Sequence, residues 1–174
     1  MFDNLIRRIL QNPDRIVGPF LQPGMNAIDI GCGTGYFTTA IARCTAPGGI
    51  VTAVDLQQEM LDVVREKTRR EGLEDRVRFH RCREDTLGLG GEPAGFALAF
   101  WMAHEVPDQD RFFREVAAAL TPGGKFLVAE PILHVSSDAF EETLARARKA
   151  GFTVAGRPGI FWSRAAVLEK EGNG

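Results

Sequence analysis

The sequence predicts a single α/β domain built on a doubly wound sheet, and three observations lead to this fold class. Short apolar runs alternate with segments of helical spacing. Glycine and proline separate these elements, and a glycine-rich turn follows the first run. Hydrophobic residues make up 44% of the 174 residues and charged residues 25%, which is typical of a globular protein. We therefore expect residues 1–174 to form one domain around a sizeable core.

The apolar runs predict strands that are buried on both faces, because they lack the alternation of a half-exposed strand. Five such runs lie at Ala27 to Ile30, Ile50 to Val54, Val77 to Phe79, Phe96 to Trp101 and Phe126 to Ala129. Two later β-prone runs, 152–155 and 163–168, are joined by a loop that contains Pro158 and Gly159. These last two runs predict an antiparallel pair that closes the sheet.

Apolar residues at helical spacing follow the first, second and fourth strands, so each of these segments should pack a helix on the sheet. The stripes are Phe37, Ala40, Ile41 and Cys44; Leu56, Met60, Val63 and Val64; and Phe112, Val116 and Leu120. A further helix is expected from about Asp138, which forms a capping-box pattern with Glu141, to Ala150, where Gly151 supplies the stop. The stretch 88–93 is short enough to be one loop.

The charge balance limits the partners of the protein. Lys and Arg number 21 against 23 Asp and Glu, a formal charge of -2, so no long-range field gathers nucleic acid or an anionic membrane. Nucleic acid is therefore disfavoured as a partner. No apolar run is long enough to cross a bilayer, and we expect no membrane partner. The three cysteines, Cys32, Cys44 and Cys82, form no close pair, which indicates free thiols and a cytoplasmic location.

A glycine-rich turn marks the candidate binding site. Gly31, Gly33 and Gly35 lie between the first strand and the first helix, at the carboxyl edge of the sheet, where glycine lets the backbone approach a ligand. Asp55 ends the second strand, where its carboxylate can accept hydrogen bonds from both hydroxyls of a ribose. The pattern predicts a nucleoside ligand. The alternative interpretation is a tight turn in which Asp29 merely caps a helix.

The spacing of the glycines separates the possible nucleosides. A nicotinamide cofactor requires G-x-G-x-x-G, whereas here Gly35 is the fifth residue of the motif and Tyr36 the sixth. The spacing therefore favours a cofactor without a pyrophosphate, whose cation Asp29 could meet. A nicotinamide-dependent oxidoreductase remains the competing enzyme class, and a protein that binds the cofactor without catalysis is a third.

At this point the sequence resembles the class I S-adenosylmethionine-dependent methyltransferases, and the likeness covers nearly the whole chain. The residues that carry it are Ile28-Asp29-Ile30-Gly31-Cys32-Gly33-Thr34-Gly35, Val54-Asp55 and Leu120-Thr121-Pro122-Gly123-Gly124-Lys125. The nearest group is the type-11 small-molecule methyltransferases, which include quinone-ring carbon methyltransferases. The resemblance implies a Rossmann-like sheet of seven strands in the order 3-2-1-4-5-7-6, with the last strand antiparallel and helices on both faces. It also implies S-adenosyl-L-methionine as cofactor, S-adenosyl-L-homocysteine as product, and a small-molecule acceptor whose O, S, N or C atom stays undetermined.

The resemblance implies a role for each matching position. The glycine turn would lie under the methionine part of the cofactor with Asp29 near its ammonium, Asp55 would hold the ribose, and aromatic residues would wall the site. The residues implied to bind the cofactor are Asp29, Gly31, Cys32, Gly33, Gly35, Asp55, Leu56, Gln57, Arg83, Glu84, Phe100 and Trp101. Arg83 takes the place where the family presents an acid to the adenine amino group, so either Glu84 or Asp85 is expected to substitute. Gly95 is a second departure, because many relatives have Asp there.

His104 and Glu130 are the candidate catalytic residues, because they follow the fourth strand and end the fifth. Transfer of a sulfonium methyl group needs positioning and a dry pocket but no metal. A neutral His104 can take a proton from the acceptor near neutral pH, and Glu130 can orient it or bind an amine. The alternatives are that His104 contacts the cofactor or caps a helix, and that Glu130 bonds local backbone. The spacing of these residues matches no metal motif.

Residues 1–23 are expected to form an N-terminal helical segment that can serve as a lid over the acceptor. A second subunit is the other way to complete an open pocket, so a homodimer stays an open alternative.

Overall fold

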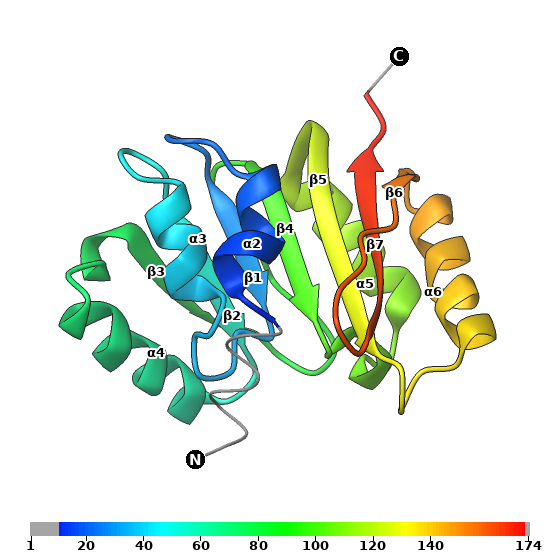
Figure 1. Cartoon of the computed structure of the whole chain (residues 1–174), viewed down its shortest axis with the longest axis horizontal. Helices are drawn as coiled ribbons and strands as arrows, with labels where there is room; N and C mark the ends of the chain where they lie inside the picture. Colours follow the sequence, from blue (N-terminus) through cyan, green and yellow to red (C-terminus); the bar gives the residue numbers. More distant parts are fainter. Residues whose placement is uncertain (1–10, 173–174) are drawn as a thin grey trace.

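The computed structural model describes residues 11–172, in which seven strands form one sheet in the order β3-β2-β1-β4-β5-β7-β6 (Figure 1). The strands are β1 (Ala27–Ile30), β2 (Val51–Asp55), β3 (Val77–Arg81), β4 (Ala94–Phe100), β5 (Leu120–Pro131), β6 (Phe152–Gly156) and β7 (Ser163–Lys170). β1 to β5 run parallel, whereas β7 is antiparallel to both β5 and β6. The expected fold class, strand order and antiparallel last strand are confirmed.

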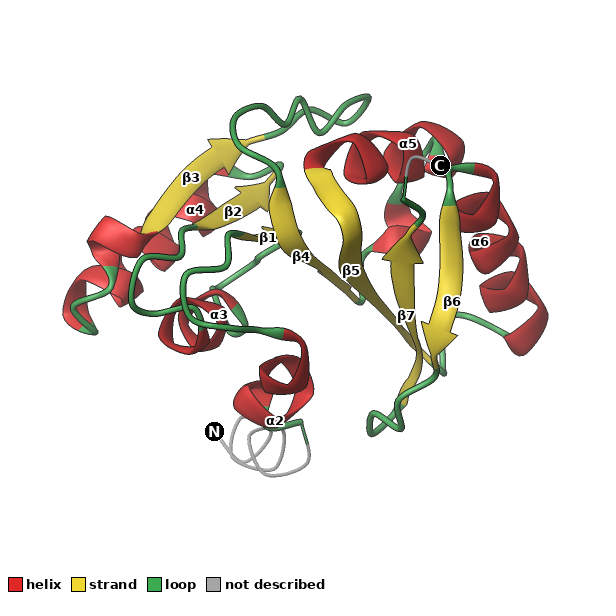
Figure 2. Ribbon diagram, turned by 90° about the horizontal axis from the view of Figure 1, so that it is seen from above, coloured by secondary structure: helices red, strands yellow, loops and turns green. Residues whose placement is uncertain are grey.

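Helices cover both faces of the sheet, as Figure 2 shows. They are α2 (Pro13–Val17), α3 (Thr38–Cys44), α4 (Gln58–Arg70), α5 (Gln109–Ala119) and α6 (Ser137–Lys149), with 3-10 turns η1 (Gly18–Phe20), η2 (Glu74–Arg76) and η3 (Ala103–Glu105). Helix α2 and turn η1 lie within the expected N-terminal helical segment 1–23, of which residues 1–10 lie outside the described part. No helix of residues 11–172 combines the length and apolarity needed to span a bilayer.

The sheet separates two hydrophobic cores, because side chains of a strand alternate between its faces. One core joins Phe113 of α5 and Leu144 of α6 to Ile28 and Ile30 of β1. The other joins α3 and α4 to the sheet and includes Phe96 of β4. The two cores pack against the strands whose ends position the site.

The connection between β3 and β4, residues 82–93, contains no helix. Within it Arg83 and Thr86 form an antiparallel bridge. The His80 Nε2 of β3 lies 2.7 Å from the Leu87 carbonyl oxygen, which ties the connection back to the sheet. The expected loop at 88–93 is confirmed as the second half of this connection.

Several expected boundaries are wrong. β4 begins at Ala94 and not at Phe96, Leu120 starts β5 and does not belong to the helix before it, and Leu56 lies exposed outside α4. Helix α6 is capped by Ser136, whose Oγ accepts a hydrogen bond from the Ala139 amide at 3.1 Å, and Asp138 lies inside the first turn, where its charge favours the helix dipole. Strand β5 begins at Leu120, which pairs with Ala94, and not at Phe126. Pairing resumes at Lys125, so residues 121–124 form an insertion that looks like a turn in the sequence.

Candidate functional site

A cavity of about 680 Å³ opens at the carboxyl ends of β1, β2 and β4. Five segments line it: Ile30 with Gly31 and Gly33, residues 55–57 with Met60, residues 82–87, residues 100–102, and residues 105–108 with Arg111, Phe112 and Glu115. A volume of this size is in the range of small-molecule and cofactor sites. The position matches the crevice at which doubly wound sheets bind ligands.

The three glycines of the turn have positive φ but different surroundings. Gly33 has φ +50°, and a Cβ atom there would meet no atom within 4 Å, so its bare peptide faces open space. A Cβ on Gly31 would lie 2.8 Å from Met102 Cγ. A Cβ on Gly35 would lie 3.1 Å from the methyl groups of Val64, so this glycine lets α4 pack closely and does not line the cavity. Gly31 and Gly33 are the two glycines that a ligand can approach.

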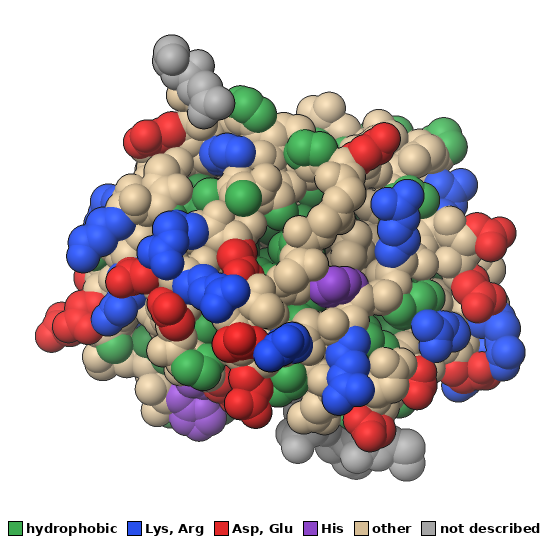
Figure 3. All heavy atoms as spheres, turned by 180° about the vertical axis from the view of Figure 1, so that it is seen from behind, with side chains coloured by type: hydrophobic (Ala, Val, Ile, Leu, Met, Phe, Trp, Pro, Cys, Tyr) green, Lys and Arg blue, Asp and Glu red, His purple; other side chains and the backbone are tan. Residues whose placement is uncertain are grey.

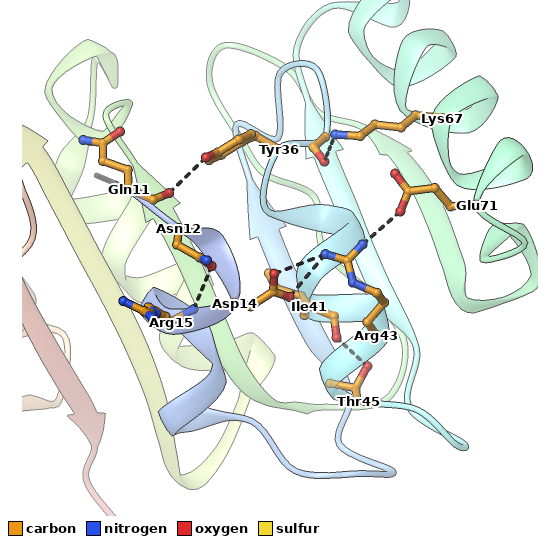
Figure 4. A network of polar contacts seen from close by, with 11 residues as sticks. Gln11, Asn12, Asp14, Arg15, Tyr36, Ile41, Arg43, Thr45, Lys67 and Glu71 are labelled. Carbon is orange, nitrogen blue, oxygen red and sulfur yellow. Dashed lines mark hydrogen bonds and ion pairs between the residues drawn. The ribbon is translucent and has the colours of Figure 1, made fainter. Parts of the chain in front are cut away.

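The glycine turn is held at its far end by polar contacts that Figure 4 shows. The Lys67 ammonium of α4 donates to the Gly35 carbonyl at 3.0 Å. The Tyr36 hydroxyl donates to the Gln11 carbonyl at 3.0 Å. These contacts fix the backbone that follows Gly33, and so preorganise the turn.

Asp55 closes the turn from the neighbouring strand. Its Oδ2 accepts a hydrogen bond from the Gly33 amide and its Oδ1 one from the Gln57 amide, each at 2.9 Å. Each carboxylate oxygen has a second lone pair, so both can still accept a bond from a ligand hydroxyl. Leu56 and Gln57 continue the same wall.

Asp29 lies behind the glycine turn and not on the cavity lining. Its side chain is buried, and the Thr38 hydroxyl of α3 donates to its Oδ2 at 2.6 Å. Burial raises the pKa of Asp29 to about 6, and the nearby charge of Asp55 acts in the same direction. Cys32 is also buried away from the lining, and burial raises the pKa of its thiol.

The turn after β3 brings the three candidates for the adenine contact to the cavity. Arg83, Glu84 and Asp85 all line it. Arg83 forms an ion pair with Asp85 at 3.3 Å. Glu84 forms no ion pair within the described part of the chain, so its carboxylate is the one not neutralised by a neighbouring cation.

Phe100 and Trp101 line the cavity at the end of β4. Their rings stack with centroids 5.3 Å apart. Trp101 has φ +61°, a strained conformation for a bulky residue. Its amide donates to the Ala129 carbonyl at 2.7 Å and its Nε1 to Ser163 Oγ at 2.8 Å, and these bonds hold it in place.

His104 and Glu130 lie together beside the cavity but not on its lining. The His104 Nδ1 is 2.5 Å from Glu130 Oε2, and the His104 amide donates to Oε1 at 3.1 Å. Glu130 is 1% exposed, and burial raises its pKa although the contact with His104 opposes the shift. The carboxylate thus contacts both the imidazole and the backbone amide of His104. The described residues contain no group of three or more His, Cys, Asp or Glu side chains placed to hold a metal.

Sequence reasoning missed the wall that α5 contributes. Arg111, Phe112 and Glu115 line the cavity from this helix. The apolar spacing of Phe112 predicted packing on the sheet and gave no sign of the cavity. The position of α5 in the chain could have indicated this wall, because a segment that follows a parallel strand starts at the carboxyl edge of the sheet.

A doubly wound sheet with this order and this antiparallel strand, opening at a glycine turn and an acid, defines the class I methyltransferase fold. The chain belongs to the methyltransferase domain family, whose model matches residues 27–124, more than half of the chain.

Relatives and solved structures agree with this assignment. The chain is 32% identical over 118 residues to methyltransferase GfsG of Streptomyces halstedii, covering 68% of this chain and 42% of that protein. It is 29% identical over 123 residues to the ubiquinone/menaquinone biosynthesis C-methyltransferase UbiE of Vibrio campbellii, covering 69% and 48%. The chain thus spans less than half the length of these relatives. A crystal structure of a SAM-dependent methyltransferase from Aquifex aeolicus has the same fold, with a TM-score of 0.82, 22% identity, and coverage of 94% and 92%.

Proposed function

We propose that the protein binds S-adenosylmethionine in the cavity and transfers its methyl group to a small-molecule acceptor. The observation that carries this proposal is the pair formed by Asp55 and the bare peptide of Gly33, joined at 2.9 Å. A carboxylate with two free lone pairs suits a ribose diol, and an adjacent peptide without a side chain suits the amino-acid tail of the cofactor. The family membership supports the same assignment.

The remaining cofactor contacts are part of this proposal. Leu56 and Gln57 lie against the adenine, Phe100 and Trp101 wall the site, and Glu84 accepts the bond from the adenine amino group. The bound cofactor supplies a methyl group on a sulfonium, which is already activated for displacement. The chain therefore has to align the acceptor in line with that methyl group and exclude water.

Asp29 acts on the cofactor through the field of its charge. It lies behind the turn, so its carboxylate stabilises the cofactor ammonium across the peptide of the glycine turn. A nearby cation favours ionised Asp29, so binding of the cofactor should lower the pKa of this buried group.

His104 serves as the base for an acceptor that must lose a proton. With Nδ1–H donated to Glu130, the imidazole presents Nε2 as an acceptor, which is the form a general base needs. Glu130 is the positioning residue of this pair. The His104 side chain is 26% exposed, so it is accessible to an acceptor above β4 and β5.

The small-molecule class of the acceptor is supported by the names of the relatives and by the surface. UbiE is named for a quinone pathway. Figure 3 shows acidic and basic side chains interspersed on the face of the molecule that lies behind the view of Figure 1, so this face has no basic stripe for nucleic acid. The three cysteines are free, which supports a cytoplasmic location. The single-domain organisation of residues 1–174 belongs to the same proposal, in which either a lid at 1–23 or a second subunit completes the open pocket.

Calorimetry with S-adenosylhomocysteine tests the cofactor assignment. Asp55→Ala should weaken binding about tenfold or more, since a hydrogen bond to a charged group contributes about 1.5 to 3 kcal/mol. Asp62→Ala removes an exposed carboxylate of α4 and is the matched control. Equal affinities of the wild type and Asp55→Ala for S-adenosylhomocysteine would refute the cofactor assignment.

Turnover is tested by the formation of S-adenosylhomocysteine with a panel of phenols, thiols, amines and quinols. We expect His104→Ala to bind the cofactor as the wild type does and to lose most of its turnover with a protic acceptor. Loss of binding in His104→Ala would overturn the base assignment. Tight binding without turnover on any acceptor would favour a non-catalytic binding protein.

A further inference from the structure

The wall of the cavity at residues 82–87 lacks regular secondary structure, although all six of its residues line the cavity. A segment without a helix or strand ladder needs other bonds to keep one shape. The bridge between Arg83 and Thr86 closes a local turn but does not tie this turn to the rest of the fold. At the start of the wall, the Cys82 amide donates to the Asp55 carbonyl of β2 at 3.0 Å, and the other bonds that place the wall come from elements further along the chain or the sheet.

Glu115 of α5 supplies two bonds at the other end of the wall. Its Oε1 accepts from the Thr86 hydroxyl at 2.7 Å, and its Oε2 accepts from the Leu87 amide at 2.5 Å. The Leu87 carbonyl oxygen lies 2.7 Å from His80 Nε2 of β3. The peptide groups on either side of Leu87 are thus held by two different elements, by α5 through one carboxylate and by β3 through one imidazole.

The charge of Glu115 strengthens this arrangement. Its side chain is 22% exposed, and Arg111 Nε, one turn earlier on α5, donates to Oε1 at 2.9 Å. Burial alone would raise the pKa of Glu115, but the bonds from Thr86, Leu87 and Arg111 outweigh it and lower the pKa. The carboxylate is therefore ionised at neutral pH, and its hydrogen bonds are charge-assisted.

We propose that Glu115 is a positioning residue of the cofactor site, which holds the wall 82–87 at the distance from Asp55 that the nucleoside requires. The inference rests on the proposed function, since it assumes that the adenosine part lies between these two walls. The connection between β3 and β4 contains no helix, and Glu115 supplies two of the hydrogen bonds that hold it. Its removal frees the wall and leaves the glycine turn in place.

Three variants test this role by calorimetry at a temperature where each is fully folded by circular dichroism. Glu115→Ala should weaken S-adenosylhomocysteine about tenfold and Glu115→Gln about threefold, because glutamine keeps the shape and loses the charge. Glu142→Gln on α6 is the control and should bind as the wild type does. Adenosine alone should lose affinity by the same factors, because the wall contacts the nucleoside. A general loosening of the fold would also disturb the glycine turn and weaken S-adenosylhomocysteine more than adenosine.

Amide hydrogen exchange of the ligand-free protein provides a readout that does not depend on the cofactor. Exchange in residues 82–88 should accelerate about tenfold in Glu115→Ala, while exchange in β1 and β2 should stay unchanged. If Glu115→Ala fails to fold, Thr86→Val removes one of the bonds from the other side, and we expect an affinity weaker by about threefold.

The outcomes separate the two proposals. Failure of the wild type to bind S-adenosylhomocysteine would refute the proposed function and the positioning role together. Normal binding by the wild type and equal binding by Glu115→Ala would refute the positioning role alone. Faster exchange in residues 82–88 with unchanged affinity would show a clamp that does not serve the cofactor, and would also overturn the inference.

Discussion

Replacing Asp29 by asparagine should change the pH dependence of stability. The carboxyl group is 2% exposed and its pKa is raised from 3.8 to about 6 by burial. A shift of this size corresponds to about 3 kcal/mol against folding when Asp29 is fully ionised, because each pKa unit is worth about 1.4 kcal/mol. The asparagine side chain carries no charge at any pH, so the variant lacks this penalty while its amide oxygen still accepts from Thr38.

The direction of the pH effect on stability depends on whether the folded or the unfolded state binds the Asp29 proton more tightly. The folded-state pKa lies above the unfolded one, so between about pH 4 and pH 6 the folded state holds more protons and its stability falls as pH rises. The penalty is complete above about pH 7. The difference in unfolding free energy between Asp29→Asn and the wild type should therefore grow by about 2.5 kcal/mol from about pH 4 to about pH 8, in favour of the variant.

Urea unfolding followed by circular dichroism at several pH values from about 4 to about 8 measures this difference. A constant offset between the two curves is expected, since the new amide also needs a partner for its N–H groups. Asp62→Asn changes an exposed carboxylate and should show no growth of the difference with pH. If the curves of Asp29→Asn and the wild type stay parallel over this range, Asp29 does not titrate as a buried acid.

Two further predictions concern local geometry, and urea unfolding checks both. Gly49→Ala should destabilise the protein by at least about 2 kcal/mol, because the new Cβ would overlap the Met25 carbonyl oxygen and lie 2.8 Å from the Thr45 carbonyl oxygen. In Gly72→Ala the new Cβ meets open space, so this control should cost only the strain of its positive φ. Equal losses of stability in the two variants would contradict the clash at Gly49. Ser136→Ala should lower the free energy of unfolding by about 1 kcal/mol, because it removes the cap of α6, and Ser137→Ala should lower it much less. A larger loss in Ser137→Ala would show that a later residue caps the helix.

Much of the fold could be predicted from the sequence where local pattern and burial agree. The runs that became β1 and β2 are apolar because helices cover both faces there. The start of β5 could not be predicted, because Pro122 to Gly124 have turn composition while the pairing of Leu120 with Ala94 depends on a distant strand. The cap at Ser136 was missed because Asp138 matches the capping pattern equally well in sequence.

The site shows the same division between local and distant causes. Gly33 and Asp55 line the cavity, and they could be predicted to lie at the carboxyl edge because the motif and the end of a strand place them there. Asp29 was expected beside the ligand, but the alternation of β1 turns its side chain toward Thr38 and away from the cavity. Glu115 gave no signal, because its partners Thr86 and Leu87 lie 29 and 28 residues away.

Because the sheet divides the interior into two cores, the protein should tolerate substitutions in each core independently of the other. In β4, Phe96 and Leu98 belong to the core under α3 and α4, whereas Ala97 and Ala99 belong to the core under α5 and α6. Substitutions in the two halves share few neighbours, so their effects should combine additively. The residues of one core can then be replaced while the other core keeps its packing. The strands keep their pairing, so the edge of the sheet that carries the cavity stays as it is.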